Sequence, residues 1–313
     1  MGLWAVGWRL TAYVALLVAA LLLLQGVAVA LDPDTLGYLT LAGSAAACLA
    51  AWIANWVMMS TVESRPPAAL GLPLTARGAR DLVTGVGFGL ALIAGTVLLM
   101  LVAGWASWSG GPGSVLPPFG STLYMSLLLV LAALFEELAV RGYPFQLLGR
   151  AGGGAVAVGG TALVFALLHG ANPGVGGTAL ANTFLAGILL GILYWKTLSL
   201  WLVTGVHFAW NWAMGVAAGL PVSGLDVGRR VAGITVDGPE LWTGGAYGPE
   251  GGLVLTLVTI AGIAWTARTR RLSRDPAVVA LRPPLYREAG SRMAAAEGFS
   301  GGPEPDRIES EES

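Results

Sequence analysis

Residues 127–141, LLLVLAALFEELAVR, place Glu136, Glu137 and Arg141 directly after a continuous apolar run. Such a run is typical of a membrane helix, where ionisable side chains cost free energy unless they are paired or used. Between Leu82 and Leu225 the only other charged residues are Arg150 and Lys196. The stretch therefore predicts a functional site inside a membrane-embedded fold.

The composition of the whole chain supports this class. The sequence is 55% hydrophobic and 11% charged with a mean hydropathy of +0.72, far more apolar than soluble domains. At 313 residues it predicts an all-α, polytopic membrane bundle of about eight transmembrane helices. The net charge of -1 gives no indication of a nucleic-acid partner. The single Cys48 excludes a disulfide within the chain and a cysteine metal cluster.

The predicted membrane spans divide the chain into a catalytic part and its surroundings. Residues 1–120 contain the N-terminal spans and their loops, and residues 121–220 contain a catalytic core of four spans. An extracytoplasmic loop follows at 221–251. The last span and its basic flank occupy 252–281, and a disordered acidic tail occupies 282–313. The stretches expected to cross are 10–31, 36–59, 82–104, 121–148, 155–170, 178–195, 198–220 and 252–267.

The distribution of Arg and Lys predicts the orientation of the spans. Loops containing Arg9, Arg65, Arg150 and Lys196 alternate with loops that have fewer basic residues, and the last span is followed by arginines 268–274. By the positive-inside rule both termini face the cytoplasm. If the span carrying Glu136 ends early, at Arg141, the site would lie shallow and open towards the cytoplasm.

Three short patterns carry the chemistry, each on its own predicted span. Glu137 and Arg141 are four residues apart and share a helix face, whereas Glu136 points about 100° away. The only two histidines follow the same spacing, in Phe165-x-x-x-His169 and His207-x-x-x-Asn211. One pattern alone is a weak signal. Their joint occurrence on three spans predicts one site assembled across the bundle.

These patterns resemble the CAAX protease and bacteriocin-processing family of intramembrane proteases, which includes the type II CAAX prenyl endopeptidases. The resemblance covers residues 121–215. It implies that Glu136 is the general base, that His169 and His207 hold the water and stabilise developing charge, and that Asn211 donates to the oxyanion. It implies that Glu137 supports the site, oriented by Arg141 or sharing a proton with Glu136.

The sequence leaves the involvement of a metal open. Glu136, His169 and His207 form a sufficient ligand set for a catalytic Zn²⁺, and the family has been described both as metalloproteases and as glutamate-dependent proteases. The His-Glu-x-x-His signature of zinc proteases is missing. No other cofactor site is predicted.

Simpler readings of the same residues stand beside this one. Either histidine alone could hydrogen-bond a neighbouring helix, Glu137 and Arg141 could be an internal salt bridge, and Asn211 could join two helices. Phe165 reads as packing, and the Gly187-x-x-x-Gly191 spacing predicts close helix contact. A non-catalytic scaffold, a proton-coupled transporter and a bis-His haem electron carrier are the alternative functions.

The resemblance implies a peptide or protein substrate associated with the lipid bilayer, with the question of a lipid group on it left open. One Lys against 16 Arg, with the Ala, Gly, Leu and Val bias, indicates a prokaryotic cell membrane. C-terminal prenylation is not expected there, so the prediction does not include a prenyl group.

Overall fold

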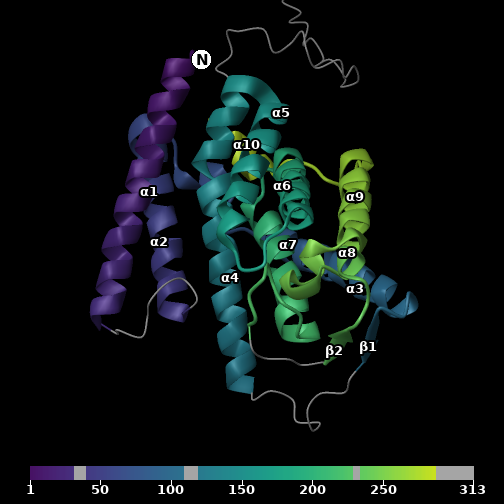
Figure 1. Cartoon of the computed structure of the whole chain (residues 1–313). Helices are drawn as coiled ribbons and strands as arrows, with labels where there is room; N and C mark the ends of the chain where they lie inside the picture. Colours follow the sequence, from purple (N-terminus) through teal and green to yellow (C-terminus); the bar gives the residue numbers. More distant parts are fainter. Residues whose placement is uncertain (32–39, 109–118, 228–232, 287–313) are drawn as a thin grey trace, which may run out of the picture.

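The computed structural model describes residues 1–31, 40–108, 119–227 and 233–286, and these are mostly helical. The long helices stand side by side as a bundle (Figure 1). They are α1 (Leu3–Leu31), α2 (Leu41–Val57), α3 (Ala76–Val102), α4 (Phe119–Arg141), α5 (Tyr143–Leu168), α6 (Gly177–Thr197), α7 (Leu200–Trp212) and α9 (Leu253–Arg268).

Among the described residues, five helices are long and apolar enough to cross a membrane. The chain is therefore built as a multi-pass membrane protein, as predicted. The count of about eight transmembrane helices is not confirmed, because α7 and α9 have only 13 and 16 residues and α4 and α5 count together as one candidate, Phe119–Ala171. The five candidates are Leu3–Leu31, Leu41–Val62, Ala76–Val102, Phe119–Ala171 and Gly177–Thr197.

The fourth and fifth predicted spans join differently from the expectation. The helix carrying the glutamates ends at Arg141 rather than near 148, and α5 begins at Tyr143 with Pro144 in its first turn, a position that proline tolerates. Helix α5 then folds back at Gly153, whose φ of 78° is readily adopted only by glycine. The fold-back brings the second half of α5 alongside the site.

Helices α5 and α6 approach closely at the predicted Gly187-x-x-x-Gly191 spacing. A Cβ atom at Gly187 would lie 2.8 Å from the Cα of Ala162, and one at Gly191 would lie 3.1 Å from Val158. The two glycines therefore have the structural role expected of small residues between membrane helices.

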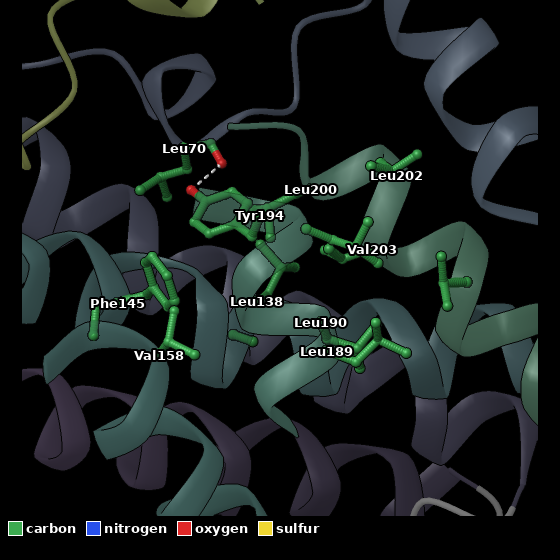
Figure 2. Close-up of a cluster of buried hydrophobic side chains, with 14 of the residues drawn as sticks. Leu70, Leu138, Phe145, Val158, Leu189, Leu190, Tyr194, Leu200, Leu202 and Val203 are labelled. Atoms are coloured by element: carbon green, nitrogen blue, oxygen red, sulfur yellow. Dashed lines mark hydrogen bonds between the residues drawn. The ribbon is translucent and has the colours of Figure 1, made fainter. Parts of the chain in front are cut away.

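A large apolar core joins α4, α5, α6 and α7 (Figure 2). Within it the Tyr194 hydroxyl donates to the carbonyl oxygen of Leu70 at 2.7 Å and accepts from Gln146 Nε2 at 2.7 Å. These bonds satisfy a buried phenol and fasten the 3₁₀ turn Pro67–Leu70 to α6. The amide N–H of Leu285 donates to Gln146 in the same region, and residues 287–313 of the predicted tail lie outside the described residues.

The opposite end of the bundle carries a small sheet that the all-α prediction did not include. Strand β1 (Ala106–Trp108) pairs antiparallel with β2 (Ile234–Val236), with Ser107 opposite Thr235. The predicted extracytoplasmic loop supplies β2 and the short helix α8 (Glu240–Thr243). The rings of Trp105 and Trp242 pack at this end with centroids 5.4 Å apart. These strands are three residues long, too short for a hydrophobic pattern to indicate them.

Candidate active site

The three sequence patterns meet at one point of the bundle. Glu136 comes from α4, His169 follows the end of α5, and His207 comes from α7. The Oε2 atom of Glu136 lies 3.9 Å from His169 Nε2 and 3.7 Å from His207 Nε2. A carboxylate and two imidazoles separated by up to 71 residues of sequence therefore face one another. These gaps are too long for direct hydrogen bonds and are wide enough for a bridging water.

A cavity of about 530 Å³ contains this cluster. Leucine, valine, alanine and phenylalanine side chains form most of its wall, so the reacting groups lie in an environment of low polarity. Asn211 lines it one helical turn from His207, as the sequence predicted. The other polar residues of the wall are Asn172, Asn182, Thr183, Ser223, Asp226 and Glu250.

Hydrogen bonds at Nδ1 orient both histidine rings. His169 Nδ1 lies 2.8 Å from the carbonyl oxygen of Phe165, and His207 Nδ1 lies 2.8 Å from Glu137 Oε1. Because a carbonyl or carboxylate oxygen only accepts, we infer that both Nδ1 atoms carry the proton. Each ring therefore turns its Nε2 atom towards Glu136.

Glu137 and Arg141 form the ion pair that their spacing predicted. Arg141 Nη1 lies 3.1 Å from Glu137 Oε1, and both side chains are fully buried. Arg141 Nη2 also donates to the carbonyl oxygen of Gly187 at 3.4 Å. The same Glu137 oxygen holds His207, so Glu137 orients the imidazole while Arg141 balances its charge. Glu136 points away from this pair into the cavity, with Oε2 lacking a hydrogen-bond partner among the described residues.

Phe165 packs against the charged and catalytic groups at once. Its ring centroid lies 4.6 Å from that of His169 and 5.8 Å from that of His207, and the Arg141 guanidinium carbon lies 4.4 Å from it. The packing role expected for Phe165 is thus a positioning role within the site.

If the site cleaves peptides, as the motif resemblance implies, replacing Phe165 by Leu is expected to lower kcat by about tenfold or more, because a small displacement of reacting groups is costly. The rate of peptide cleavage and the melting temperature would be measured together. Phe88→Leu is the matched control, since Phe88 packs against Trp265 and does not line the cavity. A Phe165→Leu enzyme with unchanged kcat would contradict the positioning role.

No sequence pattern predicted that Glu250 borders the cavity. Its Oε1 accepts from Trp210 Nε1 at 2.9 Å, and its Oε2 accepts from the Ser223 hydroxyl at 2.9 Å and from the Ser223 backbone N–H. Asn172 Nδ2 donates to the Ser223 carbonyl oxygen at 3.1 Å, and Asn182 holds the backbone of Glu250. Glu250 lies 39 residues beyond Asn211 in a segment without a recognisable motif, so only the tertiary fold places it there.

The cluster was tested for its fit to a zinc ion. Its donor atoms are of the types that zinc prefers. Within residues 1–31, 40–108, 119–227 and 233–286, however, no group of three His, Cys, Asp or Glu side chains is placed to hold a metal ion. The donor atoms of Glu136, His169 and His207 would have to move closer together to hold Zn²⁺.

Residues 118–213 match the sequence model of a family described as Rce1-like, type II CAAX prenyl endopeptidase Rce1-like. The match confirms the resemblance seen in the motifs and covers less than half of the chain. It includes Glu136, His169, His207 and Asn211. Comparison with curated proteins and with solved structures gave no match.

Proposed function

We propose, from the Rce1-like type II CAAX prenyl endopeptidase domain at residues 118–213, that this chain is an intramembrane endopeptidase. It would hydrolyse a peptide bond in a membrane-associated peptide or protein. The observation that carries the proposal is the convergence of Glu136 Oε2 on two histidine Nε2 atoms within one cavity. This arrangement supplies a place for water beside a base in an apolar pocket large enough for peptide side chains.

The proposed reaction begins with a water held between these three groups. Glu136 takes a proton from the water, and the oxygen forms a bond to the carbonyl carbon of the substrate. An imidazole that carries a proton on both ring nitrogens can donate from Nε2 to the oxyanion. The amide of Asn211 would be a second donor. Glu136 then passes its proton to the leaving amine as the carbon–nitrogen bond breaks.

The rest of the cluster holds this arrangement in place. Glu137 fixes the His207 ring through Nδ1, and the Phe165 carbonyl oxygen fixes His169 in the same way. Preorganised groups of this kind need little rearrangement when charge develops in the transition state. The buried Arg141 keeps Glu137 ionised and hence an acceptor for His207.

Single His169→Ala and His207→Ala variants test the proposed site. Both are expected to insert into the membrane and to lose cleavage by about 10²-fold or more, since each removes one contact to the water. Purified variants would be mixed with a peptide library, and products would be detected by mass spectrometry. Retained cleavage in both variants would rule out this site. Unchanged binding of a protein partner together with absent cleavage in the wild type would instead favour a scaffold.

Removing metal ions tests the glutamate-based form of the proposal. We expect cleavage to persist after dialysis against a strong chelator, because the steps assigned to Glu136, His169 and His207 use protons alone. Metal content would be measured on the same sample by mass spectrometry. Activity that falls with chelation and returns with added Zn²⁺ would contradict this form and assign the same three side chains as ligands.

A further inference from the structure

We propose, building on the endopeptidase function above, that the cavity receives its substrate from the extracytoplasmic side of the membrane. The substrate class is then a peptide segment exposed on that side, or a membrane-anchored segment entering from it. A lipidated C-terminus in the cytosol would be excluded as a substrate. The inference comes from the end of the bundle at which the cavity lies.

The cavity occupies one half of the bundle. It is lined by the second half of α7, the end of α5, the first half of α6 and the first turn of α9, which all lie towards the same end. On α4 the lining extends from Val140 back to Met125, away from Arg141. The segment 222–227 and Glu250 border it, and Gly224 donates its backbone N–H to the carbonyl oxygen of Tyr247 near the β1–β2 end. Figure 1 shows this end opposite the N-terminus of α1.

The other end of the bundle collects the basic side chains. Arg150 Nη1 lies 2.6 Å from Glu63, and Arg9 lies 3.6 Å from the same carboxylate. Lys196 Nζ donates to the carbonyl oxygens of Thr266, Ala267 and Thr269 at the end of α9, where it complements the helix dipole. Further basic residues at this end, in helix ends and connecting segments, are Arg65, Arg77, Arg80, Arg268, Arg270, Arg271, Arg274 and Arg282.

The charge asymmetry assigns the two ends to the two sides of the membrane. In the sequence, the connection between α1 and α2 contains Asp32 and Asp34, the connection between α3 and α4 contains no charged residue, and residues 219–252 contain four acidic residues against two arginines. Loops rich in Arg and Lys stay in the cytoplasm. The basic end is therefore cytoplasmic, and the cavity end is extracytoplasmic.

This conclusion reverses the expectation that a helix ending at Arg141 would open the site to the cytoplasm. Helix α4 does end there, but the first part of α5, residues 143–152, extends the bundle beyond it by about 15 Å at 1.5 Å per residue. Glu136 is thus separated from the basic end by the packed core of Leu138, Tyr143 and Phe145. Water and peptide reach Glu136 from the cavity side.

The residues near the cavity's polar border indicate what kind of segment enters. Asp226 is exposed, and Glu250 lies beside Ser223; no Arg or Lys side chain lines the described part of the cavity. A peptide with clustered acidic residues next to the cleaved bond would be repelled there. Apolar or basic residues at those positions are expected in good substrates.

Cysteine accessibility tests the proposed face without depending on activity. In a Cys48→Ala background, Ser107→Cys and Thr235→Cys report on the β1–β2 end, Arg270→Cys on the basic end, and Ala186→Cys on the cavity. The probe is a small, charged, membrane-impermeant methanethiosulfonate reagent applied to intact cells and to inside-out vesicles. We expect labelling of Ser107→Cys, Thr235→Cys and Ala186→Cys in intact cells, and labelling of Arg270→Cys only in inside-out vesicles.

Two outcomes would overturn the proposal. One is Ala186→Cys that reacts only in inside-out vesicles, and the other is Arg270→Cys that reacts in intact cells while Thr235→Cys does not. A cleavage assay distinguishes these two outcomes from a failure of the endopeptidase function. A peptide substrate identified with purified enzyme should be cleaved by intact cells that produce the wild-type protein. Cleavage only in inside-out vesicles would overturn the proposal that the cavity opens to the extracytoplasmic side. A protein that cleaves no peptide but is labelled as expected would refute the endopeptidase function and would still support access to the cavity from the extracytoplasmic side.

Discussion

The Glu136→Gln variant is expected to cleave peptides about 10²–10⁴ times more slowly than the wild type, the usual contribution of a general base. Glutamine keeps the size of the side chain and can still hydrogen-bond, but it cannot accept the proton of the attacking water. Since Glu136 is 28% exposed to the cavity and makes no buried ion pair like that of Glu137, its replacement should leave the fold intact. The rate at saturating substrate is the quantity to compare.

The matched control for this variant is Glu240→Gln, which makes the same chemical change on an exposed turn outside the cavity. Its cleavage rate and melting temperature should equal those of the wild type. A Glu136→Gln protein that melts normally and cleaves at more than about a tenth of the wild-type rate would show that another group activates the water.

The Glu137→Ala variant is expected to lose about 3–5 kcal/mol of stability, because it leaves the fully buried Arg141 without its partner. It should also lose activity, since His207 Nδ1 then has no acceptor and the ring is free to turn. Thermal unfolding in detergent would measure the first effect, and peptide cleavage by the folded fraction at low temperature would measure the second.

A double variant separates the two roles of Glu137. Glu137→Leu with Arg141→Met removes both charges and fills the space with apolar side chains, which is often neutral or favourable for a buried pair. We expect its melting temperature to recover most of the loss while cleavage stays low. Recovery of cleavage along with stability would mean that Glu137 acts only through Arg141 and that its bond to His207 is dispensable.

Much of the candidate site could be predicted from local spacing. Helical geometry puts Glu137 and Arg141 on one face and turns Glu136 away from it, and the structure shows this arrangement. The Gly187-x-x-x-Gly191 contact followed from the same periodicity. The choice between a Glu137 paired with Arg141 and one sharing a proton with Glu136 needed the position of His207, which no local pattern supplies.

The limits of the prediction lie where contacts are long-range or where the backbone leaves the regular helix. The break at Gly142 divides the predicted span 121–148, because the apolar sequence continues across that glycine, whereas the fold-back at Gly153 lies in the predicted connection between residues 148 and 155. The short strands at Ser107 and Thr235 stabilise each other across 128 residues of chain, and neither segment alone indicates a strand.

The motifs singled out the residues proposed to carry the chemistry, and the sequence by itself determined the membrane class of the protein and the helix faces on which those residues stand. These follow from hydropathy and from the 3.6-residue period, which act within one helix. Only the tertiary structure decided that Glu136, His169 and His207 face one cavity, that Glu250 borders it, and that the cavity lies away from the arginine-rich end. Those facts depend on how helices pack against one another, and packing is fixed by shape across the bundle.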